Sequence, residues 1–166
     1  MMKTAIDRTV EHVSATIQAM PDEIVASFPE MRAAGFVDIE KMGGTRLPLG
    51  ALVGRSRVFE IDLDESTVNP LQVGQFVPSS FDGRATVRVR YDAQGAAHKR
   101  EVQARAMGEQ LVILKALILS NWPSVTGLVN FRADTGTITN GTAYDDTGAE
   151  YDFVLSEITV DFSVDV

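Results

Sequence analysis

Two Asp-Thr-Gly triplets, at positions 134–136 and 146–148, are the residues of this chain whose types and spacing could support acid–base chemistry. In aspartic proteases such triplets supply two carboxylates that share one proton in a desolvated site. There the triplets directly follow apolar strands, whereas these two follow polar segments rich in turn residues. Because Asp and Gly are also ordinary turn residues, we interpret both triplets as turns.

The remaining residues offer no combination typical of a metal or nucleotide site. The two histidines, His12 and His98, have no second ligand at helical spacing, and the chain contains no cysteine. The acidic residues around Asp145 and Asp152 lack the spacing of a calcium-binding loop, and neither a glycine-rich phosphate loop nor a Gly-x-Ser-x-Gly elbow occurs. The sequence therefore predicts no catalytic residue, no cofactor and no metal.

Charge is distributed unevenly along the chain. The 15 basic and 23 acidic residues give a net charge of −8, and residues 134–166 hold eight acidic residues without Lys or Arg. The stretch 84–105 is basic in contrast. A chain with this balance is a poor candidate for binding nucleic acid through its phosphates. The segregation favours self-association instead.

Two stretches have the apolar spacing of helices. A helix over about residues 4–20 is predicted by five residues at steps of four and three, namely Ile6, Val10, Val13, Ile17 and Met20. A second helix is predicted over 97–121, with a stripe formed by Met107, Leu111, Leu114 and Ile118 beside a broad apolar flank. The width of this apolar arc predicts that the second helix is centrally buried.

Alternation of polar and apolar residues predicts strands at 36–40, 57–63 and 85–91. After the second helix we expect short strands with turns at 134–136 and Asn140-Gly141, then one long strand. In that last strand the apolar positions change from odd to even numbers at Ser156-Glu157, which predicts a β-bulge that keeps both sets facing the core. The order predicts a single α+β domain over 1–166, with a mixed, mostly antiparallel sheet and two main helices packed on one face.

Candidate subunit contacts come from two sources. Residues 43–57 and 64–83 are predicted to be long loops, and their apolar residues either contact neighbouring subunits or fold back onto their own core; these are Leu47, Leu49, Leu52, Phe76 and Phe81. The others are charged residues on strand faces turned away from the core, namely Arg84, Arg88, Arg90, Asp161 and Asp165. Whether these charges pair within one sheet or across subunits stays open at this point.

The pattern of almost the whole chain resembles the tail terminator proteins of long-tailed bacteriophages and gene-transfer agents. The resemblance consists of an amphipathic first helix, a strand at 85–91 leading into a long helix, closure of that helix at Trp122-Pro123, and a hairpin with an acidic tip before residues 157–164. It implies a structural virion protein whose hexameric ring caps the tail tube and joins it to the head connector. The family brings no catalytic residues. The long 64–83 connection and the extended C-terminal hairpin region depart from its pattern.

The partners implied by the resemblance are further copies of this chain, the tail tube protein and the head–tail connector or neck protein. DNA would pass through without specific binding, and the protein would act in the virion after assembly in the host cytoplasm. No membrane partner is expected, because the longest apolar run, 111–119, is too short to span a bilayer and contains Lys115. The start of the chain also lacks the apolar segment of a signal peptide.

Two alternatives remain open at the level of the sequence. One is another neck or tail-completion ring protein. The other is a small ligand-binding α+β domain or enzyme, which would be marked by a closed apolar pocket with convergent polar groups.

Overall fold

A computed structural model describes residues 3–20, 35–43, 47–52, 54–68, 80–93 and 96–165. The helices are α1 (Ala5–Gln18) and α2 (Ala96–Ile118), with short 3-10 helices at Ile39–Lys41, Leu49–Ala51 and Trp122–Ser124. The strands are β1 (Val37–Asp38), β2 (Val58–Val68), β3 (Ser80–Asp92), β4 (Leu128–Tyr144) and β5 (Glu150–Asp165). The sequence also allows a short helical piece from Pro21 to Pro29, and these residues lie outside the described ranges.

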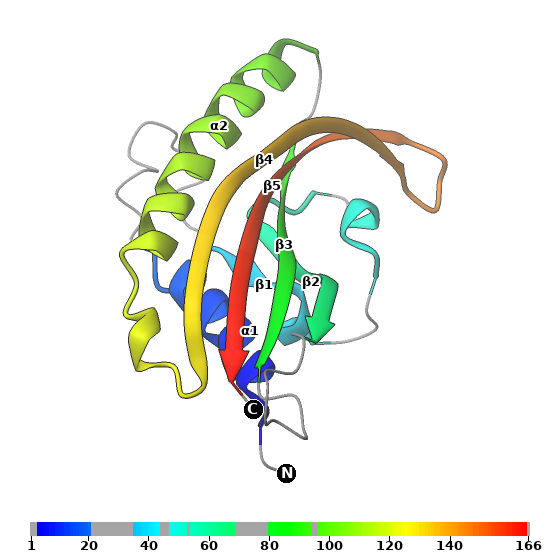
Figure 1. Ribbon diagram of the computed structural model, residues 1–166. Helices are drawn as coiled ribbons and strands as arrows, with labels where there is room; N and C mark the ends of the chain where they lie inside the picture. Colours follow the sequence, from blue (N-terminus) through cyan, green and yellow to red (C-terminus); the bar gives the residue numbers. More distant parts are fainter. Residues whose placement is uncertain are drawn as a thin grey trace, which may run out of the picture.

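The strands form one mixed sheet in the order β1-β2-β3-β5-β4. β1 runs parallel to β2 over only two residue pairs, whereas β2, β3, β5 and β4 pair antiparallel with their neighbours. In Figure 1, β4 and β5 form a long curved hairpin, and α2 lies alongside β4. The fold is therefore α+β with a mostly antiparallel sheet, as predicted.

The main hydrophobic core lies on one face of this sheet. β3 and β5 pair in unbroken register, so the odd-numbered residues of β3 share a face with the even-numbered residues of β5. Val87 and Val89 meet Ile158 and Val160 there, together with buried side chains from both helices: Val13, Ile17, Val102, Ala106, Ile113 and Leu117. Burial of each large apolar side chain contributes roughly 1.5–3 kcal/mol.

The start of α1 is a capping box formed by Thr4 and Asp7. The Thr4 hydroxyl accepts from the Asp7 amide at 3.1 Å, and an Asp7 carboxylate oxygen accepts from the Thr4 amide at 2.9 Å. The Thr4 hydroxyl also donates to the Asp7 carboxylate at 2.7 Å, and this bond, followed by that from the Thr4 amide, holds the pKa of Asp7 below its usual value. The strand predicted at 36–40 is shorter than expected, because the chain turns into a 3-10 helix directly after Asp38.

The predicted bulge at Ser156-Glu157 is wrong. β5 pairs with β3 without a register shift, so residues on either side of the phase change face opposite sides of the sheet. Leu155 packs on a second hydrophobic cluster, and Phe153 on the same side is buried. This second cluster consists of Ile39, Leu49, Leu52 and Val58. The change from odd to even apolar positions therefore marks a strand that is covered on both faces.

The turns predicted at 134–136 and at Asn140-Gly141 are also wrong, because β4 runs through both positions. The irregularity is a bulge within β4, where Thr135 and Ile138 pair with Ile158 and Ser156. Gly141 lies directly under the ring of Phe153, so a Cβ at that position would overlap the ring. Gly141 therefore serves a close cross-strand contact rather than a turn.

The hairpin turn lies at 145–149, which contains the second Asp-Thr-Gly triplet. The Asp145 amide donates to the Ala149 carbonyl at 3.0 Å, and the Asp145 carboxylate accepts from the amides of Thr147 and Ala149. Hydrogen bonds from the Thr147 side chain and the Ala149 amide lower the pKa of Asp145. The turn interpretation is confirmed for this triplet only.

The segment 64–83, predicted to be a loop, is strand at both of its ends. β2 extends to Val68 and β3 begins at Ser80, with Val68 paired to Phe81. The run Asp64-Glu65-Ser66-Thr67 is polar throughout, which conceals the strand from an alternation analysis. Residues 69–79, including Phe76, lie outside the described residues.

Candidate functional site

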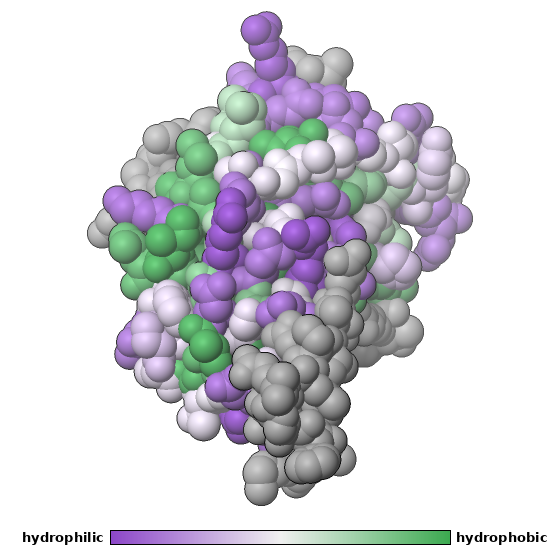
Figure 2. All heavy atoms as spheres, viewed as in Figure 1, coloured by the Kyte–Doolittle hydropathy of each residue, from purple (hydrophilic) through white to green (hydrophobic). Residues whose placement is uncertain are grey.

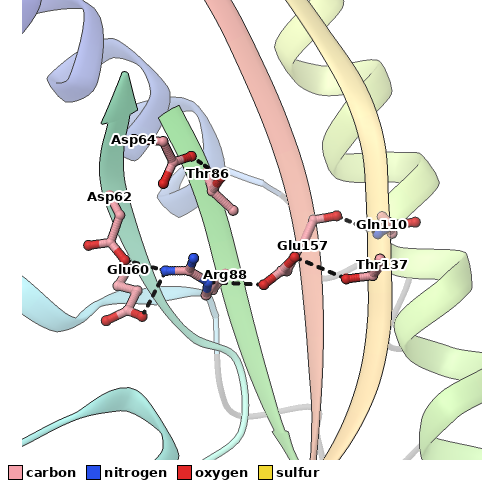
Figure 3. A network of polar contacts seen from close by, with 8 residues as sticks. All are labelled: Glu60, Asp62, Asp64, Thr86, Arg88, Gln110, Thr137 and Glu157. Carbon is pink, nitrogen blue, oxygen red and sulfur yellow. Dashed lines mark hydrogen bonds and ion pairs between the residues drawn. The ribbon is translucent and has the colours of Figure 1, made fainter. Parts of the chain in front are cut away.

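The sheet face opposite the main core, called the outer face below, carries a network of charged side chains centred on Arg88. Register pairs Glu60 of β2, Arg88 of β3 and Glu157 of β5 across neighbouring strands. Arg88 lies 3.7 Å from Glu60, donates from Nε to Glu157 at 3.0 Å, and also contacts Asp62. Figure 3 shows this guanidinium between the carboxylates of β2 and that of β5. Three carboxylates thus share one cation.

The electrostatics of this network follow from its partial burial. Desolvation disfavours the charged form of Arg88, but the hydrogen bond with Glu157 and the charges of Asp62 and Glu60 outweigh it, so the pKa of Arg88 is raised. Arg88 remains 30% exposed, so each cross-strand pair contributes only ~0.2–1 kcal/mol. The network orders the outer face and leaves it with an acidic excess.

Gln110 connects this network to α2. Its side-chain amide donates to the Glu157 carbonyl at 2.6 Å, next to the β4 bulge (Figure 3). The bulge interrupts the ladder between β4 and β5, and Gln110 supplies a donor to a carbonyl beside the interruption.

Two of the basic residues predicted as subunit contacts, Arg84 and Arg88, form ion pairs within the chain. Arg84 and Asp161 are directly opposite each other in β3 and β5, with Nε and Oδ1 2.7 Å apart. The pair borders a shallow open depression that Asp82, Asn130 and Ser163 also line. Arg84 and Arg88 are therefore paired inside one sheet, while Asp165 lies exposed at the end of β5.

Arg90 does not lie on the surface as predicted. It is 0% exposed, its guanidinium stacks 4.8 Å above the ring of Phe153, and Nη1 donates to the Arg55 carbonyl at 2.5 Å. Asp92 lies 3.8 Å away. Burial lowers the pKa of Arg90, and the charge of Asp92 opposes this shift. Arg90 is on the outer face, but the second hydrophobic cluster covers that end of the face.

The apolar candidates from the predicted loops divide into two groups. Leu49 and Leu52 are buried in the second cluster, so for them the alternative of folding back onto the chain's own core holds. Phe81 belongs to β3 and packs against the main core. Leu47 is 47% exposed and remains available for contact.

A buried ion pair was missed by the sequence analysis. Arg57 and Glu109 are both at most 2% exposed, with the Arg57 Nε donating to Glu109 Oε1 at 3.0 Å. Arg57 has a φ of 60°, an uncommon conformation for a residue other than glycine, and also lies 5.0 Å above the Phe36 ring. Burial, then the charge of Glu109, raise the pKa of Tyr91 well above its usual value. Since none of these groups reaches solvent, the cluster acts in packing rather than binding.

The most unusual surface feature is an apolar stripe on α2. Three large side chains of α2, with Leu119 directly after its last residue, are 51–71% exposed and are called the α2 stripe below; they are Met107, Leu111, Ile118 and Leu119. Figure 2 shows hydrophobic side chains gathered on the left of the view, where Figure 1 places the C-terminal half of α2. The expected central burial of α2 is wrong. The apolar flank enters the core, and Leu114 of the predicted stripe packs against the core as well, whereas Met107, Leu111 and Ile118 of that stripe face outward.

Among the described residues, no group of three or more His, Cys, Asp or Glu side chains is arranged to hold a metal ion. No helix in the described ranges is both long and apolar enough to cross a membrane.

Comparisons with known proteins do not assign the chain to a family. No protein-family model matches it, and no curated protein matches it. The surfaces described above, together with the order of elements, are therefore the basis for a functional proposal.

Proposed function

We propose that this protein is a structural virion protein, a tail terminator whose copies form a ring that caps the tail tube and joins it to the head connector. The observation that carries the proposal is the α2 stripe, on a helix whose other face is packed into the core. Contiguous exposed apolar side chains mark interaction surfaces in folded domains. The order of elements, which resembles tail terminators, supplies the kind of assembly.

The charge of the outer face supports the same proposal. Glu60, Asp62 and Glu157 share Arg88, so this network keeps a negative excess. A surface of this sign repels phosphate groups, which fits a protein that does not hold DNA.

The test is electron microscopy of negatively stained protein, with particle masses measured over a range of concentrations. We expect rings with a central opening, and in the presence of tail tubes from the same virus we expect density at tube ends but not along tube walls. Association that needs the tube end is compatible with the proposal, since weak interfaces depend on concentration. Strict monomers with no attachment to tubes would contradict it, and rings that ignore tube ends would favour a different position in the neck.

A further inference from the structure

We infer that in the assembled ring the α2 stripe of one copy packs against the outer edge of β2 on the next copy. This inference rests on the proposed function and names the surfaces through which it would operate. Three observations carry it: the chemistry of the α2 stripe, the matching chemistry of β2, and the positions of the two surfaces at opposite ends of the sheet.

The α2 stripe combines apolar and basic character. Lys115 is exposed between Leu111 and Ile118, and Arg100 is exposed near the start of the helix. Of the two acidic residues of α2, Glu109 is buried against Arg57, whereas Glu101 is exposed and offsets the neighbouring Arg100, so Lys115 supplies the positive charge beside the stripe. A surface that fits the stripe must therefore offer apolar contact bordered by negative charge.

The outer edge of β2, defined as Glu60–Asp64, offers this combination. Leu63 is 54% exposed although it lies on the core side of the sheet, opposite Ala85. Glu60, Asp62 and Asp64 lie on the outer face, where Asp64 accepts a hydrogen bond from Thr86 and the other two contact Arg88. The exposed leucine and the three carboxylates thus lie on opposite faces of the sheet and flank the same strand edge.

Backbone pairing leaves this edge open within the described part of the chain. β1 pairs with β2 only at Val58 and Phe59, so from Glu60 onward no described strand lies on its outer side. Exposed strand edges are sites where another chain docks unless they are short, charged or covered. The carboxylates here would deter an identical strand, whereas a basic, apolar helix suits them.

The positions of the two surfaces favour a closed ring. α2 packs mainly on β4 and β5, at one end of the sheet, and β2 lies near the other end. A contact between two different surfaces leaves one of each free on every pair of copies, and such head-to-tail contacts continue until rotation closes them.

Cysteine cross-linking tests this arrangement directly, because the chain contains no native cysteine. A Leu63→Cys variant and a Leu111→Cys variant are mixed under ring-forming conditions and treated with a short bis-maleimide. We expect cross-links between the two variants, and no comparable product when Tyr144→Cys, another exposed position, replaces Leu111→Cys. If the main product is instead a cross-link between two Leu111→Cys copies, the contact is symmetric and the inference is overturned.

A charge substitution provides the second test. Leu111→Glu places a carboxylate four residues before Lys115, and this pairing within the helix should preserve the stability of the monomer. In the proposed contact, the new carboxylate would lie close to the carboxylates of β2 on the next copy and repel them. We expect a loss of assembly of about tenfold or more, against little change for the control Tyr144→Glu.

The outcomes separate the inference from the function on which it rests. If Leu111→Glu forms rings as well as the wild-type protein does, the inference is overturned and the proposed function stands. The same holds if those rings form normally but no longer attach to tubes. A Leu111→Glu monomer with a clearly lower melting temperature overturns it as well, since the stripe would then be covered by its own chain. Wild-type protein that neither self-associates nor binds tubes overturns both.

Discussion

Arg88 and Arg90 are two residues apart on the outer face of β3, yet their surroundings differ completely. Arg88 is 30% exposed in a network of carboxylates, whereas Arg90 is 0% exposed on the ring of Phe153. Strand alternation places both side chains on the same face. The difference arises because the segment containing Ile39, Leu49 and Leu52 folds over one end of that face and leaves the other end open.

This contrast shows that the face of a side chain and its exposure are separate properties. Local spacing along β3 determines the face, but a cluster assembled from distant residues determines what covers it. The same distinction applies to α2, where helical spacing predicts one apolar arc, and tertiary packing covers its flank while the stripe stays exposed.

The largest effect is expected from Arg90→Glu. This change puts a carboxylate next to Asp92 in a buried site and removes the stacking on Phe153, so it should cost at least about 5 kcal/mol, close to the whole stability of many domains. Urea unfolding followed by circular dichroism measures the loss. Arg88→Glu makes the same charge change at the open end and is the matched control. A stable Arg90→Glu protein would contradict the burial described here.

The next largest effect is expected from Glu109→Ala. Loss of this carboxylate leaves the buried guanidinium of Arg57 without its ion pair, which should destabilise the fold by about 3–5 kcal/mol. Glu109→Gln keeps an acceptor for Arg57 and should cost clearly less. Equal losses for the two variants in urea unfolding would show that the charge is unimportant.

A smaller effect is expected from Arg88→Ala at the open end of the outer face. Its cross-strand pairs are part-exposed, so their removal should cost about 1–2 kcal/mol at low salt. The loss should shrink at about 1 M ionic strength, where exposed charges are screened. A loss as large as that of Glu109→Ala, or one independent of salt, would place Arg88 in an environment like that of Arg90.

The smallest effect concerns His12, which joins α1 to the end of α2 through a 2.9 Å contact with Ser120 Oγ. Burial lowers the pKa of His12 in the folded protein, so protonation favours the unfolded chain. Its contribution to stability is present above the unfolded pKa of about 6.5 and declines as pH falls below that value. His12→Asn should therefore show a weaker decline between about pH 7 and pH 5 in thermal unfolding. Parallel profiles for the two proteins would contradict this assignment.

Much of the fold was predictable because it depends on local patterns. The capping box of Thr4 and Asp7, the helical spacing of α1 and the alternation of β3 each report on neighbouring residues. The β4 bulge and the covered glycine at 141 depend instead on cross-strand contacts with β5, so Asn140-Gly141 had the local pattern of a turn without forming one.

The candidate site was predictable only in part, for a related reason. Pairing of Arg84 with Asp161 needed only that β3 and β5 be neighbours, an arrangement that the sequence left open. The buried pair of Arg57 and Glu109 joins residues far apart in sequence, and a single Glu within an apolar helix gives no local indication of its partner. The exposure of the α2 stripe likewise depends on how α2 is rotated against the sheet.

Oxidation of Met107 tests most directly the central claim that the α2 stripe is where copies of this protein associate. Met107 is 59% exposed in one copy, and Met20 is 9% exposed and serves as an internal reference. Methionine oxidation follows exposure, so the rate at Met107 should fall severalfold when protein assembles, while that of Met20 stays low throughout. An unchanged rate at Met107 in fully assembled rings would contradict the account.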